Sequence, residues 1–261
     1  MRYASSSLII LLLFSCGNVS NPGNIGNVLS SNIIIDTSGK YAPRTWQFFL
    51  QHLPIETKPI VDYRGKETDD QQKAVGIIPF DVGTTDLQQC ADALMRLRAE
   101  YLFGQKRHSE IGFHFVSGDY YTWNEYCSGL RPVAKGNGIK FIRTTPSEKT
   151  HESLRRYLDI VYTYASTISL SKELKTASEF EIGTIVIYAG SPGHCFIIID
   201  EATNSSGEKV YKLAEGYSPA QSIYVLRNLE EKGISPWYRL KKGVIETASY
   251  RFVNYKLGKF E

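Results

Sequence analysis

The most informative stretch of this chain is residues 193–215, which read GHCFIIIDEATNSSGEKVYKLAE. Two apolar segments flank residues 204–207 (NSSG), which are typical turn formers, so the pattern predicts an antiparallel hairpin. Residues 184–188 and 223–226 have the same strand-like character, and short links rich in Gly, Ser and Pro join all four segments. Short links favour antiparallel neighbours. We therefore expect an antiparallel meander over residues 184–226.

Two helical patterns precede this meander. Residues 86–103 carry apolar side chains about every 3.6 residues, and Asp86 followed by Gln89 resembles a capping box at the helix start. Residues 154–174 repeat the helical spacing. Helices early in the chain and antiparallel strands late in it predict an α+β fold, with helices packed on an antiparallel sheet.

Composition excludes several classes of protein. The chain has 261 residues, 42% of them hydrophobic and 22% charged, as in an ordinary folded protein. Its formal charge of +3, without a stripe of Lys and Arg, gives no reason to expect a nucleic-acid partner. The five His and four Cys show no metal-ligand spacing, so no metal or other cofactor is expected. No second linker interrupts residues 41–261, which predicts a single domain.

The N-terminal residues predict where in the cell the protein is located. A seven-residue apolar block, 8–14, follows Arg2 and is too short to span a bilayer. Residues 13–16 (LFSC) resemble the lipobox of bacterial lipoproteins, which implies a signal peptide over 1–15 and an acylated Cys16. An ordinary signal peptide with an incidental cysteine is the alternative. Residues 16–40 then form a lipidated, flexible tether, and we expect the domain at the periplasmic face of a membrane in the cell envelope, anchored through its lipid.

Two residues outside the tether point to nucleophilic chemistry. Cys90 lies in the first turn of the predicted helix, where free N–H groups and the helix dipole stabilise a thiolate. His194 opens a buried strand and could exchange a proton with that thiol. With the turn centred on residues 204–207, residue 203 pairs with residue 208 and His194 faces position 217. A shift of two residues brings in Glu215 as the orienting carboxylate, with Gln221 and Asp200 as weaker choices.

The same residues have plainer interpretations. Cys90 lies on the apolar side of its helix and could be a small core residue, and His194 could be a hydrogen-bonded histidine at the core edge. A disulfide between Cys90 and Cys127 would remove the nucleophile. Cys195 is expected to point away from His194 and to pack in the core.

A cysteine on a helix, a histidine on a strand and a polar residue on the next strand resemble the arrangement of papain-like and cell-wall cysteine peptidases. That resemblance implies a thiol hydrolase or transferase acting on amide bonds, such as those of cell-wall peptides, with Cys90, His194 and Glu215 as the catalytic group. The chain departs from the pattern before the cysteine, where only the adjacent Gln88 and Gln89 are present. The oxyanion donors are therefore open, apart from the backbone N–H of Cys90.

A closer resemblance is to an uncharacterised bacterial envelope family, domain of unknown function 4846. It rests on residues 88–102 (QQCADALMRLRAEYL), 190–194 (GSPGH), 218–221 (SPAQ) and 235–238 (SPWY). The family brings no established activity. The alternative function is therefore a non-catalytic lipoprotein that binds cell wall, glycan or protein, with Trp123 and Gln221 as candidate binding residues.

Overall fold

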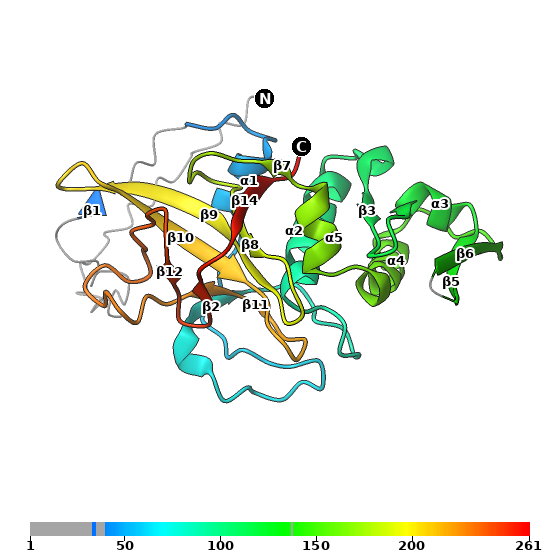
Figure 1. Cartoon of the computed structure of the whole chain (residues 1–261), viewed down its shortest axis with the longest axis horizontal. Coiled ribbons are helices and arrows are strands. Elements are labelled where there is room, and N and C mark those ends of the chain that lie inside the picture. Colours follow the sequence, from blue (N-terminus) through cyan, green and yellow to red (C-terminus); the bar gives the residue numbers. More distant parts are fainter. Residues whose placement is uncertain (1–32, 35–39, 137) are drawn as a thin grey trace, which may run out of the picture.

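The computed structural model describes residues 33–34, 40–136 and 138–261 (Figure 1). The predicted signal peptide over 1–15, Cys16 and the tether other than residues 33–34 and 40 lie outside the described residues. Among the helices of the described residues, none has the length and apolar character needed to cross a bilayer.

An antiparallel sheet of eight strands forms the centre of the fold, as predicted. Its order is β2 (Ala74–Ile78), β11 (Ile223–Leu226), β10 (Lys209–Glu215), β9 (His194–Asn204), β8 (Ile185–Tyr188), β14 (Lys256–Lys259) and β7 (Lys175–Thr176), with β1 (Ile33–Ile34) pairing β9. Every neighbouring pair is antiparallel. The meander β8–β9–β10–β11 confirms the period-two pattern read from residues 184–226.

Both faces of this sheet are buried, which explains the unbroken apolar run at the start of β9. Cys195, Ile197 and Ile199 belong to the core shared with the helices. Phe196 and Ile198 belong to a second core, closed by the C-terminal segment. Alternate side chains of one strand therefore serve two apolar layers.

Helices make the layer on the first face. They are α1 (Trp46–Gln51), α2 (Cys90–Gly104), α3 (Trp123–Cys127), α4 (His151–Tyr164) and α5 (Thr167–Glu173), with 3-10 turns η1 (Gln71–Lys73) and η2 (His108–Glu110). α2 contacts β9 and β10 on one side and α4 and α5 on the other, and α2 to α5 lie to the right of the sheet in Figure 1. α2 therefore packs between the sheet and helices α4 and α5, while α1 also contacts β9 and α5 contacts β8.

Three small hairpins complete the fold. They are β3 (Gly112–His114) with β4 (Tyr120–Thr122), β5 (Leu130–Lys135) with β6 (Gly138–Arg143), and β12 (Ile245–Glu246) with β13 (Arg251–Phe252). The first two lie in the helical half of Figure 1. The third covers the second face of the sheet.

The predicted starts of the helices need correction. α2 begins at Cys90, because the residues before it form tight turns, with the N–H of Gln89 bonded to the carbonyl of Leu87 at 2.8 Å. Asp86 does not cap the helix. Its carboxylate instead accepts hydrogen bonds from the Gln89 side chain at 3.1 Å and from the N–H of Ala220 at 2.7 Å, which ties the loop to the meander.

The helix predicted over 154–174 is two helices. Thr150 caps α4, and Ser166 caps α5 with an extended backbone and a hydroxyl that accepts the N–H of Ile168 at 3.0 Å. A serine that satisfies the first free N–H groups of a new helix favours a break at that point. The residues at this break line the cleft of the candidate active site.

Candidate active site

The start of α2 is held firmly against the sheet. The Asp92 carboxylate accepts the N–H of Gln89 at 3.0 Å and closes the first turn. A Cβ added at Gly216, just after β10, would lie 2.7 Å from the Cβ of Ala93 and 2.9 Å from the carbonyl oxygen of Gln89. The end of β10 therefore packs directly on the first turn of α2. Cys90 lies beside Gly193, just before the start of β9.

His194 and Glu215 come together through the register of β9 and β10. Leu213 pairs with Ile198 and Ala214 with Ile197, so Glu215 is diagonal to His194 on the same face of the sheet. The Nε2–H of His194 donates to Oε2 of Glu215 at 2.9 Å. The structure thus brings the predicted pair into contact.

Glu215 is a buried carboxylate with a partner for each oxygen. None of its surface is exposed, and its Oε1 accepts the hydroxyl of Tyr224 at 2.5 Å. The Tyr224 hydroxyl is also 3.1 Å from Oγ of Ser249. Because Glu215 occupies Nε2, only Nδ1 of His194 is left to exchange protons with another group.

Aromatic rings fix the imidazole from the sides. The ring centroids of Tyr217, Tyr250 and Phe252 lie 5.3, 5.0 and 5.7 Å from that of His194. The position opposite His194 in the predicted hairpin, 217, thus supplies a packing ring. An imidazole held by packing and by one carboxylate keeps a single orientation.

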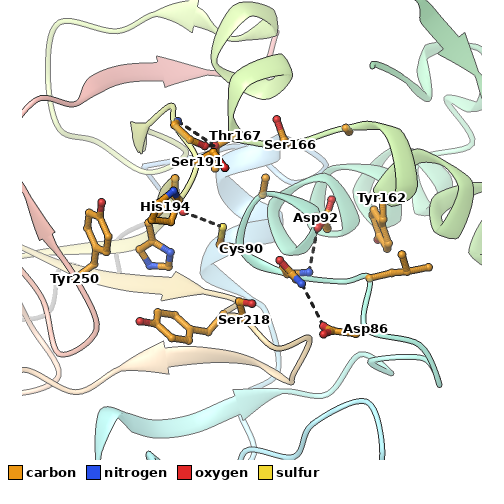
Figure 2. Close-up of a pocket in the computed structure, with 18 residues that line it drawn as sticks. Asp86, Cys90, Asp92, Tyr162, Ser166, Thr167, Ser191, His194, Ser218 and Tyr250 are labelled. Carbon is orange, nitrogen blue, oxygen red and sulfur yellow. Dashed lines mark hydrogen bonds between the residues drawn. The ribbon is translucent and has the colours of Figure 1, made fainter. Parts of the chain in front are cut away.

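The surroundings of Cys90 favour the thiolate form. Its pKa is lowered to about 5, first by a hydrogen bond from the Cys195 thiol, then by the hydrogen bond and charge of His194 and by the N–H of Ala91. Burial opposes these effects but does not cancel them. The sulfur lies 3.8 Å from the carbonyl oxygen of Gly193, the residue before His194 (Figure 2).

The surroundings of His194 favour its protonated form. Burial alone would lower its pKa, but hydrogen bonds to Cys90 and Glu215 and the charges of both groups raise it to about 9. Between these two pKa values the thiolate of Cys90 and the imidazolium of His194 are the favoured forms, which is the charge state that a cysteine nucleophile needs.

The pair opens into a cleft of about 560 Å³. Figure 2 shows its walls: the start of α2, the junction of α4 and α5, the loop 190–193, and residues Ser218 and Tyr250. Tyr217 also lines the cleft. A Cβ at Gly193 would collide with the hydroxyl of Thr167, so only glycine allows the loop to approach α5 this closely. The cleft is large enough for part of a peptide.

Comparison with known proteins assigns the chain to a family. Residues 37–259 match the family model described as domain of unknown function (4846). The chain belongs to this family. No curated protein and no solved structure gives a significant match. The family resemblance seen in the sequence is confirmed, and it assigns no activity to the cleft.

The two glutamines before Cys90 differ from each other in their surroundings. Gln88 is fully buried, accepts a hydrogen bond from Arg96 at 3.2 Å and does not line the cleft. Gln89 lines the cleft, and its amide N–H₂ is bonded to Asp86 at 3.1 Å. The N–H of Cys90, at the first helical position, has no partner within α2. It stays the primary candidate oxyanion donor, with the Gln89 amide as a second.

Other residues singled out in the sequence lie away from the cleft. Trp123 has no exposed surface and packs against Phe103 and His108, with ring centroids 5.6 and 5.0 Å away, so its ring is not accessible to a ligand. Gln221 is buried and pairs with Asp62 across a β-bridge. Asp200 bonds to Lys212 and Gln51 at the far end of β9.

The cysteines exclude one alternative and confirm one expectation. Cys90, Cys127 and Cys195 are all free thiols, so the disulfide considered between Cys90 and Cys127 is not formed. Cys195 packs in the helix-facing core, as expected, but its thiol also interacts with that of Cys90, and its own pKa is raised well above the ordinary value by burial and by that neighbour. Strand alternation, which turns residue 195 toward α2, was the available signal. Within the described chain, no cluster of three His, Cys, Asp or Glu could hold a metal.

Proposed function

We propose that this protein is a cysteine hydrolase or transferase acting on amide bonds, with Cys90 as nucleophile, His194 as acid and base, and Glu215 as the residue that positions the imidazole. The observation that carries the proposal is the arrangement of three side chains: a thiol at a helix start, an imidazole whose Nε2 bonds a carboxylate so that Nδ1 is left for proton exchange, and a buried carboxylate with a partner for each oxygen. Helices packed against an antiparallel sheet, with cysteine and histidine on facing elements, further support a papain-like arrangement.

The chemistry follows from these positions. The Cys90 thiolate attacks the amide carbonyl carbon and forms a C–S bond, while the N–H of Cys90 bonds the developing oxyanion. The Nδ1 proton of the His194 imidazolium passes to the amide nitrogen, the C–N bond breaks and the amine leaves. Neutral His194 then takes a proton from water, which attacks the thioester and releases a carboxylic acid and the thiolate. An amine in place of water makes the enzyme a transferase.

We further propose that the domain acts at the bacterial envelope, tethered through Cys16. The lipobox-like residues 13–16 and the polar segment after them support this location. Peptides of the cell wall are the amide-linked polymer available there. They are therefore the substrate class that we favour.

Alkylation tests whether Cys90 is activated. With a pKa of about 5, roughly nine-tenths of Cys90 is thiolate at about pH 6, against roughly 0.3% of a free cysteine with a pKa of about 8.5. The less basic thiolate is intrinsically slower by roughly 40-fold at a Brønsted slope of about 0.45. Cys90 should therefore react with iodoacetamide about eightfold faster than glutathione at about pH 6. A rate no faster than that of glutathione would contradict activation.

Activity is tested on purified peptidoglycan sacculi. Wild-type protein should release soluble peptides and new amino groups, measured by chromatography and amine labelling. Cys90→Ala should abolish release, whereas Cys127→Ala, which removes a free thiol outside the cleft, should retain it. Equal release by wild type and Cys90→Ala would overturn the nucleophile assignment.

A further inference from the structure

Two buried side chains that line the cleft each have one polar atom without a hydrogen-bond partner. Asp92 is 7% exposed and Tyr162 is 5% exposed. Neither Oδ1 of Asp92 nor the hydroxyl of Tyr162 has a partner in the described part of the chain. Figure 2 shows both on the side of Cys90 opposite His194 and Tyr250. A ligand that reaches the thiol therefore has room to extend toward them.

Leaving such atoms unpaired costs stability. An unsatisfied buried polar group costs about 1–3 kcal/mol. Several other buried side-chain atoms of the described chain are also unpaired, including indole nitrogens in the core, but only Asp92 and Tyr162 border this cleft. Asp92 already uses Oδ2 to accept the N–H of Gln89, so Oδ1 is the oxygen left for a ligand.

The charges around the cleft select the ligand. Among the described residues, its lining holds two carboxyl groups, Asp86 and Asp92, and neither Lys nor Arg. The positive charge of His194 is balanced by the Cys90 thiolate and by Glu215. Burial, and then the nearby Cys90 thiolate, raise the pKa of Asp92 well above its ordinary value. A cationic ligand would relieve that cost, and an anionic one would add to it.

We infer that Asp92 and Tyr162 form a subsite for a primary ammonium group of the substrate, held by the carboxylate and by the phenolic oxygen as acceptors. Oδ1 is shielded in the free protein, so the ligand reaches it after a small rotation about the soft terminal torsion of Asp92. This inference rests on the proposed function and narrows its substrate class. The substrates are amide-linked peptides that carry a free amino group close to the bond attacked by Cys90.

Charged thiol reagents test the subsite without a known substrate. Aminoethyl methanethiosulfonate is cationic and sulfonatoethyl methanethiosulfonate is anionic, and both form a disulfide with a thiolate and release methanesulfinate. The ratio of their rates with Cys90, divided by the same ratio for glutathione, measures the preference for a cation. We expect Asp92→Asn to reduce this preference about tenfold, because it removes a charge near the bound ammonium.

Matched variants separate the subsite from general charge. Asparagine at 92 can still accept the N–H of Gln89, so the first turn of α2 is retained. Asp86→Asn removes an equal charge at the exposed mouth, where solvent screens it, and should change the preference less than about twofold. Tyr162→Phe should reduce it about twofold and keeps the test valid if Asp92→Asn does not fold.

The outcomes are distinct. Slow reaction of Cys90 even with neutral methyl methanethiosulfonate would sink the proposed function. Rapid reaction with an unchanged preference in both Asp92→Asn and Tyr162→Phe would overturn the ammonium subsite alone. A preference for the anionic reagent would overturn it in favour of a site for carboxylates.

Discussion

Replacing Glu215 by glutamine isolates the electrostatic role of the buried carboxylate. Glutamine has the same shape, and its amide oxygen can accept the Nε2–H of His194, which lies 2.9 Å from Oε2 in the native protein. Its N–H₂ can donate to the hydroxyl of Tyr224, whose own proton can turn to Ser249 at 3.1 Å. The variant should therefore keep the orientation of the imidazole and lose only the charge.

The expected effect is a lower pKa for His194. An opposite charge in contact typically shifts a pKa by about 1–3 units, and His194 starts from about 9. The shift corresponds to about 1.4–4 kcal/mol of stabilisation of the imidazolium. The folded-state pKa of His194 is raised, so the ionised side chain adds to the free energy of unfolding. This contribution is complete below the unfolded pKa of about 6.5 and is lost as the pH rises through about 9.

NMR titration of the imidazole carbon-bound proton measures this shift directly. Glu201→Gln is the matched control, because Glu201 is also buried on β9 but pairs with Lys40 away from the cleft. We expect a lower pKa for His194 in Glu215→Gln and an unchanged one in Glu201→Gln. The same pKa in wild type and Glu215→Gln would refute the reasoning.

Three further predictions follow from the site. kcat/KM for peptide cleavage should rise with pH through about 5, as Cys90 ionises, and fall through about 9, as His194 loses its proton; a single limb in the profile would argue against the pair. Cys195→Ala should raise the pKa of Cys90 by removing its thiol donor, whereas Cys127→Ala should leave it unchanged, as followed by thiolate absorbance. Gly216→Ala should lower the free energy of unfolding by about 1–3 kcal/mol and slow alkylation of Cys90, because its Cβ would meet Ala93 and Gln89. Gly104→Ala, where nothing lies within 4 Å of the added Cβ, is the control in urea denaturation.

The hairpin shows what local sequence could predict. Alternation of apolar residues and the turn at 204–207 predict that position 217 lies opposite His194, and Glu215 is two residues from that position. The turn itself pairs Thr203 with Lys209, one position longer than assumed, and a β-bulge between Lys212 and Leu213 restores the assumed register before Glu215. A bulge leaves little trace in a single sequence, so the agreement at Glu215 rests on two opposite local shifts.

The other features of the site depend on long-range packing, which local sequence does not predict. Tyr224 and Ser249 support Glu215 from β11 and from the C-terminal segment, and neither contact follows from local spacing. Trp123 is a candidate binding residue by its residue type alone, whereas packing against Phe103 and His108 buries it. Asp92 falls among apolar neighbours in α2, and only the folded cleft shows that one of its oxygens lacks a partner.

The most direct measurement is the pKa of the Cys90 thiol in the intact protein. The ultraviolet absorbance of thiolate is followed against pH for wild type and for Cys90→Ser, and the difference reports this one group. The account predicts a single transition near pH 5. A transition at about 8.5 or above, as in a free cysteine, would show that the sulfur at the start of α2 is not activated and would contradict the account.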